Sequence, residues 1–179
     1  MTEFQVSLLR GINVGGHNRI SMGRLRNLYE ELGCRQVTTY VQSGNVIFAS
    51  PDEPAVVSAR AEAALEVDMG STIHVLGRTN AELGRIVAED PYPDADPTQH
   101  HVVFLAGPAS PQGLARIAAA AIDGEALVAN DGEIHLLLPG GLGRSAIPPA
   151  LTARILGVVP TARNWRTVCQ LYERSRPRS

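Results

Sequence analysis

The sequence of 179 residues contains no lysine, so every basic side chain other than histidine is an arginine. This absence excludes a lysine Schiff base, a lysine general base and the lysine of a phosphate-binding P-loop. Only two cysteines are present, Cys34 and Cys169, and they form neither a Cys-x-x-Cys pair nor another metal-binding spacing. We therefore expect no disulfide framework, and a reducing cytosol suits this cysteine usage.

Aromatic residues and net charge are also scarce. Aromatic residues make up 4% of the chain, and the formal net charge is −2. This charge provides no general attraction to nucleic acids or anionic membranes, although it leaves room for a local basic patch. No apolar run approaches the roughly 18 residues of a membrane span, and the first residues lack a signal-peptide pattern. We expect a cytoplasmic protein with no membrane partner, and its oligomeric state stays open.

Hydrophobic periodicity predicts the order βαββαβ in the first half of the chain, followed by a linking helix. Ser21 is the expected N-cap of the first helix and Gly33 its stop. The hairpin turns at Ser43-Gly44-Asn45, where glycine permits a positive φ. The predicted elements are a strand over 4–13, a helix over 21–33, strands over 37–42 and 46–49, a helix over 54–66, a strand over 72–77 and a helix over 80–88.

The second half is predicted to repeat this order after a connector rich in proline and aspartate. Such a segment continues neither a helix nor a central strand, so we place domains over 1–89 and 100–179 with a connector over 90–99. The elements expected beyond it are a strand over 101–106, a helix over 112–122, a hairpin over 125–138, a helix over 148–156, a closing strand over 162–168 and a C-terminal helix.

Two correspondences indicate that the halves arose by duplication. Arg78-Thr79-x-x-x-Leu83 recurs as Arg166-Thr167-x-x-x-Leu171, and Gly44 and Gly132 are separated by the same spacing. A four-stranded sheet with two helices on one face leaves its other face exposed, and a second copy would cover it. The predicted fold class is therefore α+β, with two tandem ferredoxin-like βαββαβ repeats, antiparallel sheets and additional helices. Chance similarity of short segments is the alternative.

The first predicted polar cluster lies at one end of the first repeat. In a βαββαβ unit the third strand runs back between the first two, so the first strand's exit and the hairpin turn lie together. Glycines let backbone N–H groups approach a ligand, and the following helix N-terminus favours an anion. Either this cluster binds a small ligand or it ties two loops together. The predicted ligand-binding residues are Arg10, Asn13, Gly15, Gly16, Asn18, Gln42, Ser43 and Asn45.

The second predicted cluster combines a glycine-rich loop over 140–145 with the end of the closing strand. Arginine forks suit phosphate or carboxylate, whereas packing in a core is favoured over ligand stacking for Trp165. Neither glycine-rich stretch has the spacing of a dinucleotide fingerprint or a P-loop. Strand alternation would place Arg163 and Trp165 on one face and Asn164 and Arg166 on the other. The predicted ligand-binding residues are Arg144, Ser145, Arg163, Asn164 and Arg166.

The histidines and acidic residues predict no further site. His100 and His101 point to opposite faces of a strand, while His74 and His135 are scattered, so we expect no metal site. The acidic residues between 89 and 96 lie among prolines, which is typical of a solvated connector. Ser43 lacks the Gly-x-Ser-x-Gly surroundings of a nucleophile. We predict no catalytic residue, no metal and no bound cofactor.

Three segments resemble the signature segments of the bacterial family called domain of unknown function 1697. They are Leu-Leu-Arg-Gly-Ile-Asn-Val-Gly-Gly at 8–16, Tyr-Val-Gln-Ser-Gly-Asn-Val at 40–46 and Arg-Asn-Trp-Arg-Thr-Val at 163–168. The resemblance covers nearly the whole chain and implies a compact, duplicated α+β protein, and the family assigns these positions no catalytic role. This chain has Ser-Ala-Ile at 145–147 and Ala-Arg at 153–154, where relatives place Ser-Lys-Leu and Glu-Arg. The departure weakens the second cluster as an anion site.

The sequence favours a cytosolic binding protein for a small anionic or nucleotide-like ligand. One alternative is single-stranded nucleic-acid binding on a ferredoxin-like sheet, which the low aromatic content and the missing ribonucleoprotein pattern over 45–50 disfavour. Another is an enzyme that uses arginine and asparagine as electrostatic stabilisers, although no general base stands out. The reaction, if there is one, does not follow from these residues.

Overall fold

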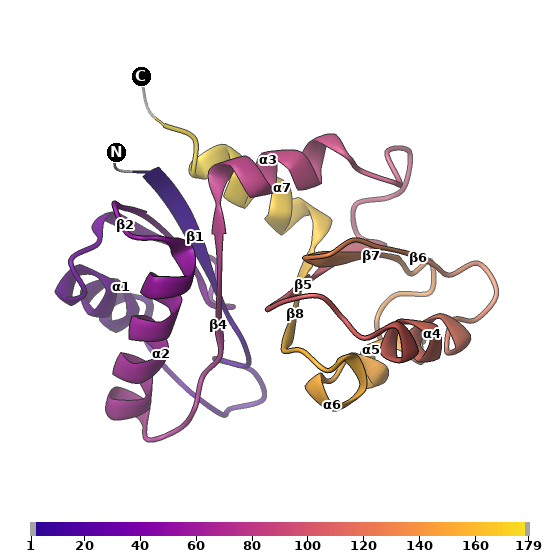
Figure 1. The fold of residues 1–179 in the computed structure, drawn as a ribbon, viewed down its shortest axis with the longest axis horizontal. Helices are drawn as coiled ribbons and strands as arrows, with labels where there is room; N and C mark the ends of the chain where they lie inside the picture. The colour runs from indigo at the N-terminus through magenta and orange to yellow at the C-terminus, as the bar shows by residue number, and fades with distance from the viewer. Residues whose placement is uncertain (1–2, 178–179) are drawn as a thin grey trace. The chain divides into compact units, whose positions relative to one another are not determined.

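A computed structural model describes residues 3–177, which divide into two compact units. The first unit comprises residues 3–88 and 170–177, and the second comprises residues 89–169. Within this described range the protein is a mixed α+β fold with two four-stranded antiparallel sheets and seven helices (Figure 1). No helix among these residues is both long and apolar enough to cross a bilayer.

The first unit begins with the predicted strand and helix order. Its elements are β1 (Glu3–Leu9), α1 (Met22–Glu31), β2 (Arg35–Tyr40), β3 (Asn45–Ser50), α2 (Pro54–Met69), β4 (Val75–Thr79) and α3 (Asn80–Ala88). The sheet order is β2-β3-β1-β4, so β3 runs antiparallel between β2 and β1. The exit of β1 and the turn between β2 and β3 therefore lie at the same end of the sheet, as predicted.

Helices α1 and α2 cover one face of this sheet (Figure 1). Their apolar residues at helical spacing pack on alternate residues of the strands, and Tyr29 lies against Phe48 with ring centroids 5.2 Å apart. Ser21 caps α1 by accepting a hydrogen bond from the Arg24 N–H at 3.1 Å, as predicted. The first core is thus built from patterns that the sequence displays locally.

The second unit contains β5 (His100–Leu105), α4 (Pro111–Ala119), β6 (Ala126–Ala129), β7 (Glu133–Leu137), α5 (Ile147–Ala150), α6 (Ala153–Leu156), β8 (Pro160–Asn164) and the start of α7 (Trp165–Arg174). Its sheet order is β6-β7-β5-β8. The short helices and α4 pack over the face that carries Val103, Ile134 and Leu136 (Figure 1). The opposite face of β5 carries His100, Val102 and Phe104, all of which are buried.

Several predicted elements differ from the structure. The first strand, expected over 4–13, ends at Leu9, and the helix expected over 112–122 ends at Ala119. The strand expected over 72–77 starts later, at Val75, and runs to Thr79. The helix expected over 148–156 is two short helices, because Thr152 caps a new one by accepting a hydrogen bond from the Ile155 N–H. The closing strand expected over 162–168 ends at Asn164, whose side chain caps α7 by accepting from the Thr167 N–H at 2.8 Å.

The helix at the end of β8 corrects the predicted alternation of the second polar cluster. Trp165 and Arg166 belong to α7, so they do not alternate with Arg163 and Asn164 along one strand. The prediction was wrong because Asn164 is a strong helix N-cap, and its side chain ends the strand four residues before the predicted end at residue 168.

Candidate functional site

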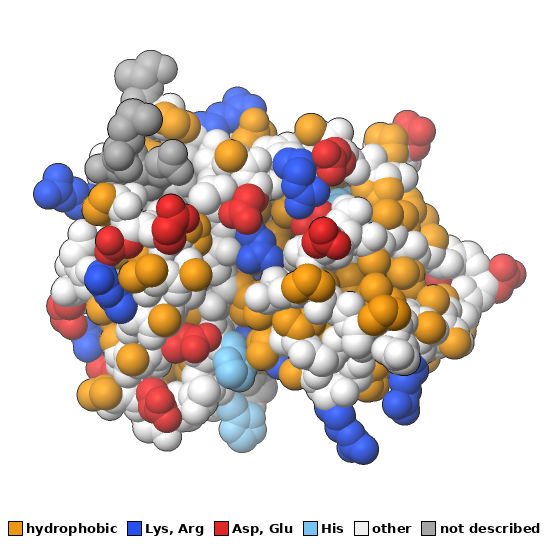
Figure 2. All heavy atoms as spheres, in the orientation of Figure 1, with side chains coloured by type: hydrophobic (Ala, Val, Ile, Leu, Met, Phe, Trp, Pro, Cys, Tyr) orange, Lys and Arg blue, Asp and Glu red, His pale blue; other side chains and the backbone are white. Residues whose placement is uncertain are grey.

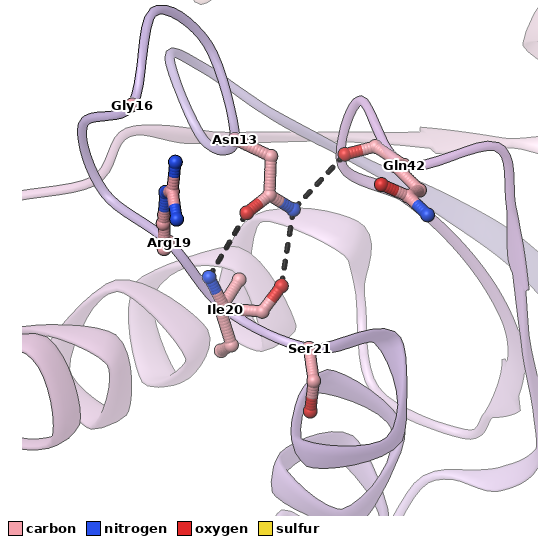
Figure 3. Close-up of a pocket in the computed structure, with 6 residues that line it drawn as sticks. All are labelled: Asn13, Gly16, Arg19, Ile20, Ser21 and Gln42. Atoms are coloured by element: carbon pink, nitrogen blue, oxygen red, sulfur yellow. Dashed lines mark hydrogen bonds between the residues drawn. The ribbon is translucent and has the colours of Figure 1, made fainter.

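A polar pocket of about 420 Å³ lies in the first unit, where the loop after β1 meets the turn between β2 and β3 (Figure 3). The loop runs into the N-terminus of α1, so the pocket also borders the start of that helix. Among described residues it is lined by Asn13, Gly16, Arg19, Ile20, Ser21 and Gln42. These residues come from both segments of the first predicted cluster.

Asn13 joins the loop to the turn. Its Nδ2 donates hydrogen bonds to the carbonyl oxygens of Ile20 at 3.0 Å and Gln42 at 3.1 Å, and its Oδ1 accepts from the Ile20 N–H at 3.0 Å (Figure 3). Its backbone has a φ of 53°, a left-handed conformation that asparagine adopts more readily than most residues. Asn13 therefore shapes the pocket wall with an amide already used in protein hydrogen bonds.

Arg19 provides the positive charge of the pocket. Its guanidinium lies close to the Gly16 backbone, because a Cβ built on Gly16 would be 3.8 Å from Arg19 Nη2. Figure 3 shows this guanidinium on the same side of the loop as the Asn13 amide. The partial positive charge of the α1 N-terminus adds to the field at this wall. An anion is the ligand that this electrostatic arrangement favours.

The turn opposite the loop is held in an unusual backbone conformation. Val41 has a φ of 51°, which is sterically unfavourable for a β-branched residue, and its side chain is 50% exposed. The fully buried Asn45 donates from Nδ2 to the Tyr40 carbonyl at 3.0 Å and to Ser43 Oγ at 3.1 Å. These bonds hold Gln42 in the position where its carbonyl accepts from Asn13.

The predicted residues of the first cluster thus separate into two groups. Asn13, Gly16 and Gln42 line the pocket, whereas Ser43 and Asn45 hydrogen-bond within the turn. The others surround the loop: Arg10 is half-buried with its N–H bonded to the His74 carbonyl, Gly15 lies near His17, and Asn18 bonds to the Gly11 carbonyl and Ser71 Oγ.

Three lining residues were missed by the sequence reasoning: Arg19, Ile20 and Ser21. Ser21 was recognised only as a helix cap, and Arg19 was omitted although it follows the predicted Asn18. An arginine two residues before an expected N-cap indicates a positively charged site, because its side chain starts beside the positive end of the helix.

The second predicted cluster consists of a serine before α5, a helix cap, a buried arginine and two exposed arginines. Ser145 Oγ accepts from the Ile147 N–H at 3.1 Å, and Asn164 caps α7. Arg163 is buried, and its guanidinium donates to Thr161 Oγ1 and to the Ala162 carbonyl. Burial lowers the pKa of Arg163 to about 10.

Arg144 and Arg166 are the exposed arginines of this cluster, and Asn164 is exposed as well. The Arg144 N–H donates to the Gly141 carbonyl, so the loop is turned on itself. Hydrogen bonds from Thr98 lower the pKa of Asp96, and attraction to Arg166 contributes a smaller lowering. Arg166 therefore has a carboxylate nearby within the second unit.

The histidines of the second unit are closer together than predicted. His100 Nε2 lies 3.0 Å from His135 Nδ1, although the two residues are on different strands. The register explains this, because Leu137 pairs with His100, and His135 lies two residues away on the same face of the sheet. The expectation that His135 lies apart from the other histidines was wrong, because spacing along the chain does not show which residues face each other across paired strands.

These features define a mixed α+β protein of two compact units with a polar loop pocket in the first. The chain belongs to the family described as protein of unknown function (DUF1697), whose family model matches residues 1–135. This membership confirms the resemblance carried by the segments at 8–16 and 40–46, and the family description names no activity.

A solved structure has the same fold over almost the full chain. It is that of the conserved bacterial protein SP0830 from Streptococcus pneumoniae, with a TM-score of 0.80 and 22% sequence identity. The match covers 98% of this chain and 100% of that one. No curated protein matches the chain.

Proposed function

We propose that this protein binds a small anionic ligand in the polar pocket of the first unit. The observation that carries the proposal is the placement of Arg19 beside Gly16 and the α1 N-terminus, in a pocket of about 420 Å³. A guanidinium fork pairs with phosphate or carboxylate oxygens, and backbone N–H groups near a glycine can approach the same oxygens. Gln42, from the opposite turn, contributes an exposed amide.

The composition of the pocket favours binding over catalysis. Arg19 is the charged side chain among the described lining residues, and the others are amide, hydroxyl, glycine and isoleucine. None of these described groups is a carboxylate, an imidazole or a thiol that could act as a general base near neutral pH. The proposed role is therefore recognition of an anion.

Nucleic-acid binding receives less support from the aromatic residues of the strands. Phe48 and Phe104 are buried, and Tyr40 is half-buried beneath the Arg174 guanidinium, 4.9 Å from the ring centroid. Bases stack on exposed aromatic rings, which these side chains do not provide. On the face drawn in Figure 2, arginine and acidic side chains are interspersed, and no basic stripe runs across it.

The proposal includes two tandem ferredoxin-like repeats as the scaffold, in domains over 1–89 and 100–179. In both sheets the strand that follows the hairpin turn lies between its hairpin partner and the first strand of its unit. The Leu9 N–H donates to the Gly44 carbonyl at 2.8 Å, and the Leu105 N–H donates to the Gly132 carbonyl at 2.9 Å. These equivalent bonds support the correspondence of the two glycines.

The second sequence correspondence does not hold in the structure. Arg78 lies in β4, whereas Arg166 lies in α7, so the two arginines occupy different elements. The comparable positions are Thr79 and Asn164, each of which ends a strand and accepts a hydrogen bond from the N–H three residues later. The proposed duplication therefore rests on topology and on these capped junctions.

Thermal shift with inorganic phosphate, sulfate, citrate and nucleoside monophosphates tests the binding proposal. A ligand at about 100 times its Kd stabilises the folded state by about 2.7 kcal/mol, which raises the Tm by roughly 5–10 °C in a chain of this size. Arg19→Gln should weaken the binding of the active anion by about tenfold or more, because a charge-assisted hydrogen bond is lost.

Arg26→Gln is the matched control, because Arg26 is an exposed arginine of α1 outside the pocket. This variant should bind like the unaltered protein. Stabilisation by none of the anions, or equal stabilisation of the Arg19→Gln variant, would contradict the proposal.

A further inference from the structure

A carboxylate and two imidazoles converge in the second unit. His100 Nδ1 lies 3.6 Å from Asp90 Oδ1, and His100 Nε2 lies 3.0 Å from His135 Nδ1. One ligand atom from each of the three residues lies within 4.8 Å of the other two. The residues come from the connector before β5, from β5 itself and from β7. Tertiary structure alone brings them together.

The three side chains are held in place by their neighbours. His100 is 1% exposed and His135 is fully buried, while the Asp90 side chain is 15% exposed. Trp165 stacks on the His100 ring with centroids 4.3 Å apart and an interplanar angle of 19°. The Tyr92 N–H donates to Asp90 Oδ1 at 2.8 Å, which fixes the carboxylate. Neighbouring residues therefore hold the His100 ring and the Asp90 carboxylate in place. The cluster is exposed to solvent mainly at Asp90.

The donor types of the cluster suit a cation. Asp90 offers a carboxylate oxygen, and His100 and His135 each offer an imidazole nitrogen. Divalent transition metal ions accept both kinds of donor.

We propose that Asp90, His100 and His135 form a binding site for a divalent transition metal ion, with zinc as the favoured ion. Two imidazoles and one carboxylate are a donor set that Zn²⁺ accepts, with bonds of about 2.0–2.2 Å. In a tetrahedral site with such bonds two ligand atoms lie roughly 3.4 Å apart, so the widest pair, within 4.8 Å, must close by up to roughly 1.4 Å.

Binding of the metal ion would replace a hydrogen bond within the cluster by bonds to the ion. One nitrogen of each ring must face the ion, so the hydrogen bond between His100 and His135 is replaced by two metal bonds. Three protein ligands leave a fourth position of the tetrahedron for water or a small ligand. Asp90, the most exposed of the three, lies on the side from which the ion would enter.

The only tryptophan of the chain makes the site directly observable. Trp165 stacks on His100, so its fluorescence reports on an ion bound to that ring. Tag-free, full-length protein that has been freed of metals is titrated with Co²⁺, a coloured substitute for Zn²⁺. We expect saturable quenching of Trp165 with one equivalent of Co²⁺, and recovery of the emission when Zn²⁺ displaces it.

Variants assign the signal to these ligands. Asp90→Asn and His135→Gln should each weaken Co²⁺ binding by about tenfold or more, since each removes a metal bond. His74→Ala is the matched control, because His74 forms a comparable pair with Glu62 at 3.7 Å in the first unit. This control should retain the quenching and the affinity of the unaltered protein.

The experiment gives a decision even if one variant fails to fold. Asp90 is half-buried in a connector, so Asp90→Asn is expected to keep the native circular dichroism and to decide the case if His135→Gln unfolds. Absence of saturable quenching in the unaltered protein, or undiminished affinity in Asp90→Asn, would overturn the site. Loss of the signal in His74→Ala would overturn it as well.

Discussion

Position 44 requires glycine because of both its backbone conformation and its packing. Its φ is 80°, and a Cβ at this position would lie 2.8 Å from the side chains of Leu9 and Ile12. Any other L-residue would therefore strain the turn and push against the core of the first unit. Because the turn positions Gln42, this glycine also maintains one wall of the polar pocket.

We expect Gly44→Ala to lower the free energy of unfolding by about 2–4 kcal/mol. About 1–2 kcal/mol comes from the left-handed backbone, and the remainder comes from overpacking. Gly33→Ala separates the two effects, since Gly33 has a φ of 88° but open space around its Cβ position. Urea denaturation should show the smaller loss for Gly33→Ala, and equal losses would contradict the steric argument.

At the scale of elements, α4 and α6 approach each other at Gly113. A Cβ on this residue would lie 2.3 Å from the backbone carbonyl oxygen of Ile155. Gly113 also supplies the N–H that Ser110 caps, so the start of α4 and its contact with α6 depend on the same few residues. Backbone atoms cannot move aside as a flexible side chain would.

Gly113→Ala should separate these helices and destabilise the second unit by roughly 2 kcal/mol or more. Gly107→Ala is the control outside α4, because its nearest neighbour would be 3.8 Å away, an ordinary van der Waals distance. Chemical denaturation followed by circular dichroism measures both variants. A Gly113→Ala protein as stable as the Gly107→Ala protein would show that the two helices are not in close contact.

The junctions between strands and helices illustrate what periodicity can and cannot predict. The helix over Asn80–Ala88 has the predicted bounds, because Thr79 and Glu82 form a capping box at a position where strand alternation also ends. At Asn164 the residues that follow include Trp165 and Val168, which also suit a strand. There the helix cap outweighed the propensities of the residues that follow.

At the scale of the whole molecule, the free energy of unfolding should depend on pH through two buried side chains in the core of the first unit, the Cys34 thiol and the Tyr29 phenol. Burial raises the pKa of the Cys34 thiol to about 11, and burial also raises the pKa of Tyr29. The unfolded chain loses the thiol proton near pH 9, before the folded chain does. The stabilisation is therefore complete below pH 9 and is lost as the pH rises through about 11.

We expect the free energy of unfolding to fall by about 2–3 kcal/mol between pH 9 and pH 11 through Cys34 alone. Cys34→Ala should remove the part of the decline that begins near pH 9, leaving the later contribution of Tyr29. Cys169→Ala, which alters the less buried cysteine, should keep the slope. Denaturant titrations at a series of pH values measure this, and an unchanged slope in Cys34→Ala would disprove the assignment.

The sequence by itself determined the α+β class, most helices and strands, and the meeting of the loop over 10–20 with the turn at Gln42. These follow from local periodicity, caps and turn residues, which act between near neighbours in the chain. Tertiary structure decided that Asn45 is buried, that Arg19 lines the pocket, and that Asp90 and His135 flank His100. Side-chain burial and strand register depend on distant segments packing together, so residue spacing alone does not determine them.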